Sequence, residues 1–188
     1  MAGDRGLAFV FIGLISLSTL WIGRNHRAAS ESKTASVTTA NPPTPGDARF
    51  LAKAVQQNLA QGLLGDLARQ KGSQTIRHLA TSISVPTDSE LRRLASLQGI
   101  KIPGAIDSEN LAAYDYLASL AGETFDRKYT AYELRVHQLV AAELQREAAL
   151  GRYPELKRFA SENLPAEEQR LLLLENTAAR LSAGGPIE

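Results

Sequence analysis

Three side chains that can bind a metal or exchange a proton lie at helical spacing within residues 122–140. They are Asp126, Glu133 and His137. A helix turns about 100° per residue, so these positions fall on one stripe of its surface. Carboxylates and imidazoles that point inward from bundle helices are ligands of iron and manganese. Glu133 and His137 can also pair with each other, because residues four apart are neighbours on a helix.

The apolar positions of the same stretch predict where that stripe lies. Five of them fall on one arc and predict the core-facing side: Phe125, Tyr129, Tyr132, Val136 and Leu139. The polar stripe lies about a quarter turn away, at the border of the core. His137 in this position is either a hydrogen-bonded histidine at the edge of the core or a ligand or acid–base group.

Candidate ligands also occur elsewhere in the chain, although the sequence does not give their orientation. They are Asp66, His78, Asp88, Asp115 and Glu168. The sequence contains no Gly-x-Ser-x-Gly elbow, no His-Glu-x-x-His helix and no glycine-rich phosphate loop. No catalytic residue is therefore predicted, and an enzyme is not the favoured interpretation.

The chain after residue 46 reads as a series of helices that would position these side chains. Glycines and prolines predict helices at residues 47–71, 73–85, 88–98, 108–121, 123–150, 154–163 and 165–182. Asp47 is the expected N-cap of the first of them. Amphipathic helices joined by short connections pack antiparallel, which predicts an all-α helical bundle over residues 47–183.

The first 27 residues predict a membrane segment. Residues 6–23 contain no charged side chain and are flanked by Arg5 and Arg24. As a helix they would span about 27 Å, close to the hydrocarbon core of a bilayer. They are either an uncleaved signal anchor or the apolar part of a cleaved signal peptide. Residues 28–46 are rich in Ser, Thr and Pro and predict a flexible tether, and residues 184–188 predict a disordered tail.

Charge and cysteine content exclude several kinds of partner. The first 29 residues hold three of the 21 basic side chains and one of the 20 acidic ones, so the remainder has a net charge of −1. Because the remainder has no excess positive charge to neutralise phosphates, binding to nucleic acid is not expected. The chain has no cysteine, which rules out disulfides and thiolate metal ligands.

The sequence from Asp47 to Leu181 resembles DUF4142, a bacterial domain family of unknown function. The residues that carry the resemblance are Phe50-Leu51, Gln61 to Gly65, Ile102-Pro103, Gly122, Phe125-Asp126, Tyr129, His137 and Leu164-Pro165. The resemblance implies a ferritin-like four-helix bundle with broken helices and a location in the cell envelope. It implies no established reaction.

The chain departs from the family at polar positions. The resemblance implies an acid where Gln61 stands, an Asp-His pair at Ser84 to Pro86, and a histidine where Arg170 stands. Among the polar positions that the family shares, only Asp126 and His137 match in this chain. A fixed positive charge at Arg170 opposes a bound cation. The stripe is therefore expected to be a remnant polar seam in which one of its members pairs with Arg170.

Two functional hypotheses follow from the sequence. The favoured one is a membrane-tethered or exported envelope protein with a non-catalytic interaction or stress-related role. It would be anchored in the inner membrane facing the periplasm, or free in the periplasm, with a protein partner that the sequence does not identify. The alternative is a ferritin-like protein that handles iron or peroxide through a reduced iron or manganese site at Asp126, Glu133 and His137.

Overall fold

The computed structural model of the chain describes residues 43–84 and 88–183, and these residues form six helices and no strand. The helices are α1 (Pro45–Lys71), α2 (Gln74–Ser82), α3 (Asp88–Leu97), α4 (Ser108–Ser119), α5 (Gly122–Leu150) and α6 (Pro154–Ser182). The prediction of an all-helical domain is confirmed. The predicted membrane segment, nearly all of the tether and the C-terminal tail lie outside the described residues. None of the helices in the described part is long and apolar enough to cross a bilayer.

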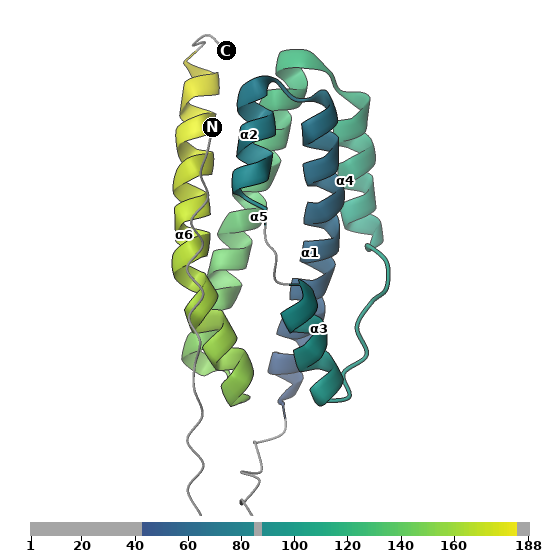
Figure 1. The fold of residues 1–188 in the computed structure, drawn as a ribbon, viewed down its shortest axis with the longest axis vertical. Helices are drawn as coiled ribbons and strands as arrows, with labels where there is room; N and C mark the ends of the chain where they lie inside the picture. The colour runs from purple at the N-terminus through teal and green to yellow at the C-terminus, as the bar shows by residue number, and fades with distance from the viewer. Residues whose placement is uncertain (1–42, 85–87, 184–188) are drawn as a thin grey trace, which may run out of the picture. The chain divides into compact units, whose positions relative to one another are not determined.

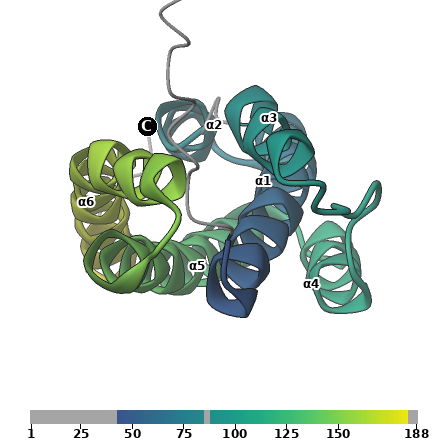
Figure 2. The ribbon, with the colours of Figure 1, turned by 90° about the horizontal axis from the view of Figure 1, so that it is seen from below.

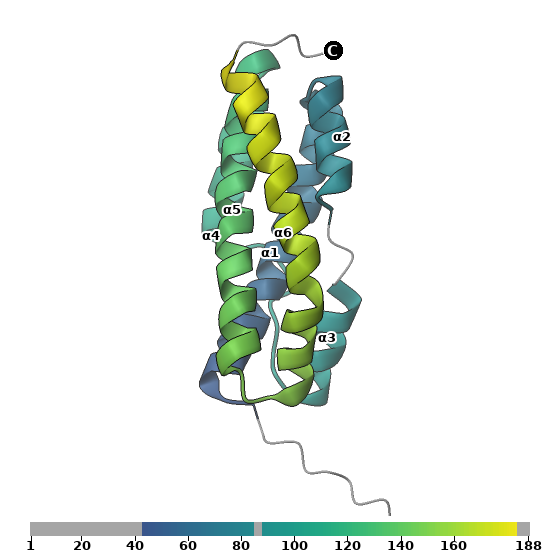
Figure 3. The same cartoon turned by 90° about the vertical axis from the view of Figure 1, so that its left-hand side faces the viewer.

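The helices form a bundle in which one column is broken into two pieces (Figure 1). α1, α5 and α6 are long columns, and α2 and α3 follow one another down a single side (Figure 3). α5 packs against both α6 and α1. α4 contacts α1 and α5 but stays on the outer side of the bundle (Figure 2). The arrangement brings α1, α5 and α6 around the same interior.

The first helix begins two residues earlier than the sequence predicted. Thr44 is the N-cap, and its hydroxyl oxygen accepts a hydrogen bond from the backbone N–H of Asp47 at 3.2 Å. Asp47 is the third helical residue, and its carboxylate accepts from the backbone N–H of Thr44 at 2.6 Å. This reciprocal capping box explains why the acid at position 47 lies inside the helix and is not its cap.

A buried glycine ends α1 as predicted. Gly72 is the C-cap, and its backbone N–H donates to the carbonyl of Ala68 at 2.9 Å. A Cβ atom at this position would lie 2.6 Å from Cγ2 of Ile76 and 2.8 Å from the carbonyl oxygen of Ala68. The missing side chain thus lets α2 turn back closely over the end of α1.

We expect Gly72→Ala to lower the free energy of unfolding by about 1–3 kcal/mol, because the added methyl group would overpack the turn. Gly62→Ala is the matched control in the middle of α1, where an added Cβ meets nothing within 4 Å. That control should raise stability by about 0.5–1 kcal/mol, since alanine favours a helix over glycine. Urea unfolding followed by circular dichroism measures both, and equal effects would contradict the close packing at Gly72.

The last two predicted helices are one continuous helix, α6, so the predicted boundary at Pro165 is wrong. Pro165 is exposed and leaves the carbonyl of Ser161 without its helical amide donor. Leu156 and Phe159 before the proline and Leu174 after it are all buried in the core. Burial of apolar side chains on both sides outweighs the cost of an interior proline, which is about 3 kcal/mol.

The buried apolar residues form two separate clusters. The first joins α1, α2, α4, α5 and α6 and includes Leu64, Ile76, Leu117, Phe125, Tyr129 and Leu174. The second joins α1, α3, α5 and α6 and includes Leu51, Val55, Leu91, Leu144, Leu156 and Phe159. Between these clusters, α1, α5 and α6 each contribute polar side chains.

Candidate functional site

A layer of buried and half-buried polar side chains lies between the two apolar clusters. We call it the polar layer, and it consists of Gln61 on α1, Glu133 and His137 on α5, and Glu167 and Arg170 on α6. Glu133, His137 and Glu167 are almost fully buried, with 0%, 2% and 1% of their surface exposed. Ionisable groups at this depth persist only when they are paired or change protonation.

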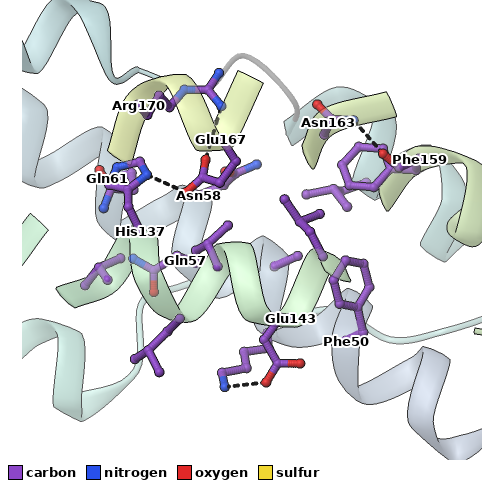
Figure 4. Close-up of a pocket in the computed structure, with 17 residues that line it drawn as sticks. Phe50, Gln57, Asn58, Gln61, His137, Glu143, Phe159, Asn163, Glu167 and Arg170 are labelled. Carbon is purple, nitrogen blue, oxygen red and sulfur yellow. Dashed lines mark hydrogen bonds and ion pairs between the residues drawn. The ribbon is translucent and has the colours of Figure 1, made fainter. Parts of the chain in front are cut away.

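The members of the polar layer are joined in a continuous chain of contacts, of which Figure 4 shows the part made by His137, Glu167 and Arg170. The amide nitrogen of Gln61 donates to Oε2 of Glu133 at 2.7 Å. Nε2 of His137 lies 3.7 Å from the same Oε2, and Nδ1 of His137 lies 2.6 Å from Oε1 of Glu167. Arg170 donates to Oε2 of Glu167 at 3.2 Å. Glu167 therefore holds both an imidazole and a guanidinium.

Burial dominates the electrostatics of the layer. It raises the pKa of Glu133 to about 7, although the nearby His137 and the hydrogen bond from Gln61 favour the ionised form. The negative charge of Glu167 also raises the pKa of Glu133. Oε1 of Glu133 and Nε2 of His137 are both buried without a hydrogen-bond partner. The layer thus contains a carboxyl that titrates near neutral pH and two buried atoms with unused hydrogen-bonding capacity.

A cleft of about 110 Å³ opens beside the polar layer. Its walls come from α1, α3, α5 and α6, and one end is apolar, with Phe50, Leu91, Leu144 and Phe159. The opposite end carries Gln57 and several members of the polar layer. Figure 4 shows the two phenylalanine rings at one end and Gln61, His137, Glu167 and Arg170 at the other.

A second pair of buried carboxyls joins the start of α1 to the end of α5. Asp47 accepts a hydrogen bond from the backbone N–H of Arg152 at 3.1 Å. Burial opposes ionisation of Asp47, but this bond and those from Thr44 and Glu147 keep its pKa below the ordinary value. Burial, together with the hydrogen bond to Asp47 and its charge, raises the pKa of Glu147 to about 7. Near neutral pH the two carboxyls thus share one proton.

The sequence model of the DUF4142 family, described as a domain of unknown function, matches residues 32–176. The chain belongs to this family. The resemblance seen in the sequence is thereby confirmed. No curated protein matches the sequence. The structure is similar to the crystal structure of a DUF305 fragment from Deinococcus radiodurans, with a TM-score of 0.65 and 19% sequence identity. That alignment covers 74% of this chain and 99% of the fragment, and at this identity it shows a shared fold alone.

The DUF4142 domain brings only two of the three predicted ligands together. Glu133 and His137 meet in the polar layer, whereas Oδ1 of Asp126 accepts a hydrogen bond from the backbone N–H of Ser73 at 3.2 Å. Asp126 lies two helical turns before Glu133, about 10 Å along the axis. Its carboxylate fastens the turn between α1 and α2 to α5. The predicted pairing partner of Arg170 is also different, since Arg170 pairs with Glu167.

Four of the five remaining candidate ligands do not reach the interior of the DUF4142 domain. Those whose side chains are described are exposed: Asp66, His78, Asp115 and Glu168. The side chain of Asp88 lies outside the described part of the chain. Within that part, no three or more His, Asp or Glu side chains are grouped so that they could hold a metal ion.

The border position predicted for the stripe on α5 was wrong. Thr130, Glu133 and His137 are buried, whereas Leu139 from the predicted apolar arc is 53% exposed. The centre of the buried face therefore lies between the two arcs. α6 packs against α5 there and supplies Glu167, which covers the histidine.

Glu167 is the functional residue that sequence reasoning missed. A helix that begins at Pro165, as the sequence predicted, would place Glu167 in its first turn, near the positive end of the helix dipole. If the helical repeat is carried through the proline, Ala160, Glu167, Leu174 and Leu181 follow one another at intervals of seven residues. The other three are buried apolar positions. That spacing was the signal that Glu167 faces the interior.

Proposed function

We propose that this DUF4142 protein is a non-catalytic binding protein of the bacterial cell envelope, with an interaction or stress-related role. The observation that carries the proposal is the contrast between the polar layer and the cleft beside it. The ionisable groups of the layer are engaged with one another, while the cleft offers an apolar wall and a polar end. Ligand-binding sites combine these two features.

The burial of the polar layer supports binding over catalysis. A general base must reach the proton that it abstracts, within hydrogen-bonding distance of the substrate. Glu133 is fully buried, and Nδ1 of His137 is already engaged by Glu167 at 2.6 Å. These groups are therefore better placed to fix the helices around the cleft than to act on a substrate.

The N-terminal sequence supports the envelope location. The apolar residues 6–23 have the length of a membrane span, and the Ser/Thr/Pro-rich residues 28–46 would separate the domain from the bilayer. A tether of this length gives the domain a typical reach of roughly 25 Å. A binding domain on such a tether would work close to the outer surface of the inner membrane.

A topology reporter tests the location. Alkaline phosphatase fused after residue 188 should be active, because it folds correctly only after export, and a fluorescent protein fused at the same point should stay dark. Deleting residues 6–23 should reverse both signals. An inactive phosphatase together with a fluorescent partner fusion would refute the envelope proposal.

A second candidate function, a reduced iron or manganese site, is favoured by two buried atoms. Oε1 of Glu133 and Nε2 of His137 have no hydrogen-bond partner, and Glu167 holds the other ring nitrogen as carboxylates do for metal-bound histidines. Two donors are fewer than the inward ligands from four helices that a dinuclear bundle site uses. The residues therefore fit a single, weakly held ion and not a dinuclear centre.

Under this second candidate, equilibrium dialysis of the full chain against Fe(II) or Mn(II) should give one bound ion per chain. His137→Ala should abolish the binding because it removes the Nε2 donor. His78→Ala, which changes an exposed histidine, is the matched control and should bind normally. The absence of binding by the unaltered chain would eliminate this candidate and leave the first one untouched.

A further inference from the structure

We infer that the buried carboxyl pair of Asp47 and Glu147 is a latch that opens as the pH rises. While the two carboxyls share a proton, the latch holds the start of α1 against the turn between α5 and α6. Loss of that proton releases the contact and opens one end of the bundle, and the rest of the domain stays folded. This regulation is independent of the function proposed above, because it requires neither a ligand nor a membrane.

The latch joins the start of α1, the last turn of α5 and the turn that leads into α6, which lie at the same end of the bundle (Figure 3). Asp47 accepts hydrogen bonds from the backbone N–H groups of Thr44 at 2.6 Å and Arg152 at 3.1 Å, and the side chain of Arg152 is exposed. Glu147 is hydrogen-bonded to Asp47. Gly151 lies so close that a Cβ atom there would overlap the carboxyl group of Glu147. One carboxyl pair therefore holds these three segments together.

The surroundings of the latch favour one negative charge over two. Asp47 and Glu147 are only 1% and 5% exposed, and two carboxylates in contact at this depth repel each other. The nearby charges on α5 are those of Glu143 and Arg146, which form an ion pair with each other at the surface. The first turn of α6 carries a further acid, Glu155, whose Oε2 is buried without a hydrogen-bond partner. The closed latch is therefore stable only while it retains a proton.

Ionisation of Glu147 is thereby coupled to opening of the latch. Its pKa is about 7 in the closed form and returns to the ordinary value of 4.5 where the contact with Asp47 is broken. A raised pKa stabilises the closed form fully below 4.5, and this stabilisation is lost as the pH passes through 7. The pKa of Asp47 is lowered, so its carboxylate stays ionised in this range and adds no slope. Between pH 6 and pH 8 the equilibrium constant for opening should rise about tenfold.

The test is hydrogen–deuterium exchange of the full chain in lipid nanodiscs at pH 6 and pH 8, read by mass spectrometry and divided by the intrinsic exchange rate at each pH. The corrected exchange should rise about tenfold in peptides that cover residues 44–50 and 147–156, which contain the latch. It should stay the same in residues 74–82 of α2, at the other end of the bundle (Figure 1). An equal rise in every peptide would overturn the local opening, and no rise at the latch would overturn its dependence on pH.

Variants assign the exchange to the carboxyl pair. Glu147→Gln keeps a donor for Asp47 and cannot ionise, so its corrected exchange at the latch should be the same at pH 6 and pH 8. Glu168→Gln, at an exposed position of α6, is the matched control and should keep the tenfold rise. If Glu147→Gln does not fold, Asp47→Asn serves instead, because it removes the charge that repels ionised Glu147 and should reduce the rise. A full tenfold rise in the folded variant of the pair would overturn the latch.

Discussion

Replacing Glu167 by alanine is expected to lower the free energy of unfolding by about 3–5 kcal/mol, because it breaks a buried ion pair from one side. The carboxylate is 1% exposed and holds His137 at 2.6 Å and Arg170 at 3.2 Å. Without it, the guanidinium of Arg170 would lose its carboxylate partner and Nδ1 of His137 would be left buried without a hydrogen-bond partner. The measurement is urea unfolding of the full chain, with the same detergent or nanodisc for each variant.

Two companion variants separate the charge of Glu167 from its position. Glu168→Ala alters the exposed neighbour on the same helix and should change stability by less than about 0.5 kcal/mol. Glu167→Gln keeps an acceptor for Arg170 but removes the negative charge, so its effect should lie between the two. A loss below about 1 kcal/mol for Glu167→Ala would mean that water reaches the layer and that its ion pairs are not truly buried.

A large loss of stability on removing one member of the polar layer does not mean that the layer as a whole stabilises the fold. Replacing a whole buried ionic group by apolar side chains of similar volume is often neutral or stabilising, by about 1–4 kcal/mol. The layer joins α1, α5 and α6 through specific pairs, and each pair forms in only one register of the helices. We therefore interpret it as a device that fixes the packing of these helices around the cleft, at some cost in stability.

The local signals in the sequence predicted most of the helix boundaries. Gly72, Gly99 and Gly151 end helices where expected, and Asp107 caps α4 by accepting from the backbone N–H of Asn110. These are short-range effects, since caps and positive φ angles depend on a few neighbouring residues. Gly99 has a φ of 62°, which other residues rarely adopt.

The candidate site was harder to predict because it depends on contacts between distant helices. His137 and Glu167 are 30 residues apart, and the sequence cannot show that α6 runs straight through Pro165 to bring them together. The assignment of Asp126 failed for a related reason. Its partner is a backbone N–H at the turn before α2, and no side-chain pattern marks that contact.

The free energy of unfolding is expected to fall as the pH rises from about 5 to 7, because of the carboxyl pair between Asp47 and Glu147. The pKa of Glu147 rises from 4.5 in the unfolded chain to about 7 in the folded one. A raised folded pKa gives stability that is fully present below 4.5 and is lost as the pH passes through 7. The loss is on the order of 3 kcal/mol. The lowered pKa of Asp47 acts only in more acidic solution, where its contribution is lost as the pH falls.

Glu147→Gln isolates this contribution, because the amide imitates the protonated carboxyl and can still donate to Asp47. The variant should lose about half of the slope between pH 5 and 7 and should be more stable than the unaltered chain at pH 8. A shallower slope of the same sign should remain, since Glu133 also has a pKa of about 7. Glu168→Gln, at an exposed position, should follow the unaltered chain at every pH. Urea midpoints at pH 5, 6, 7 and 8 measure the slopes, and an undiminished slope in Glu147→Gln would show that the shared proton lies elsewhere.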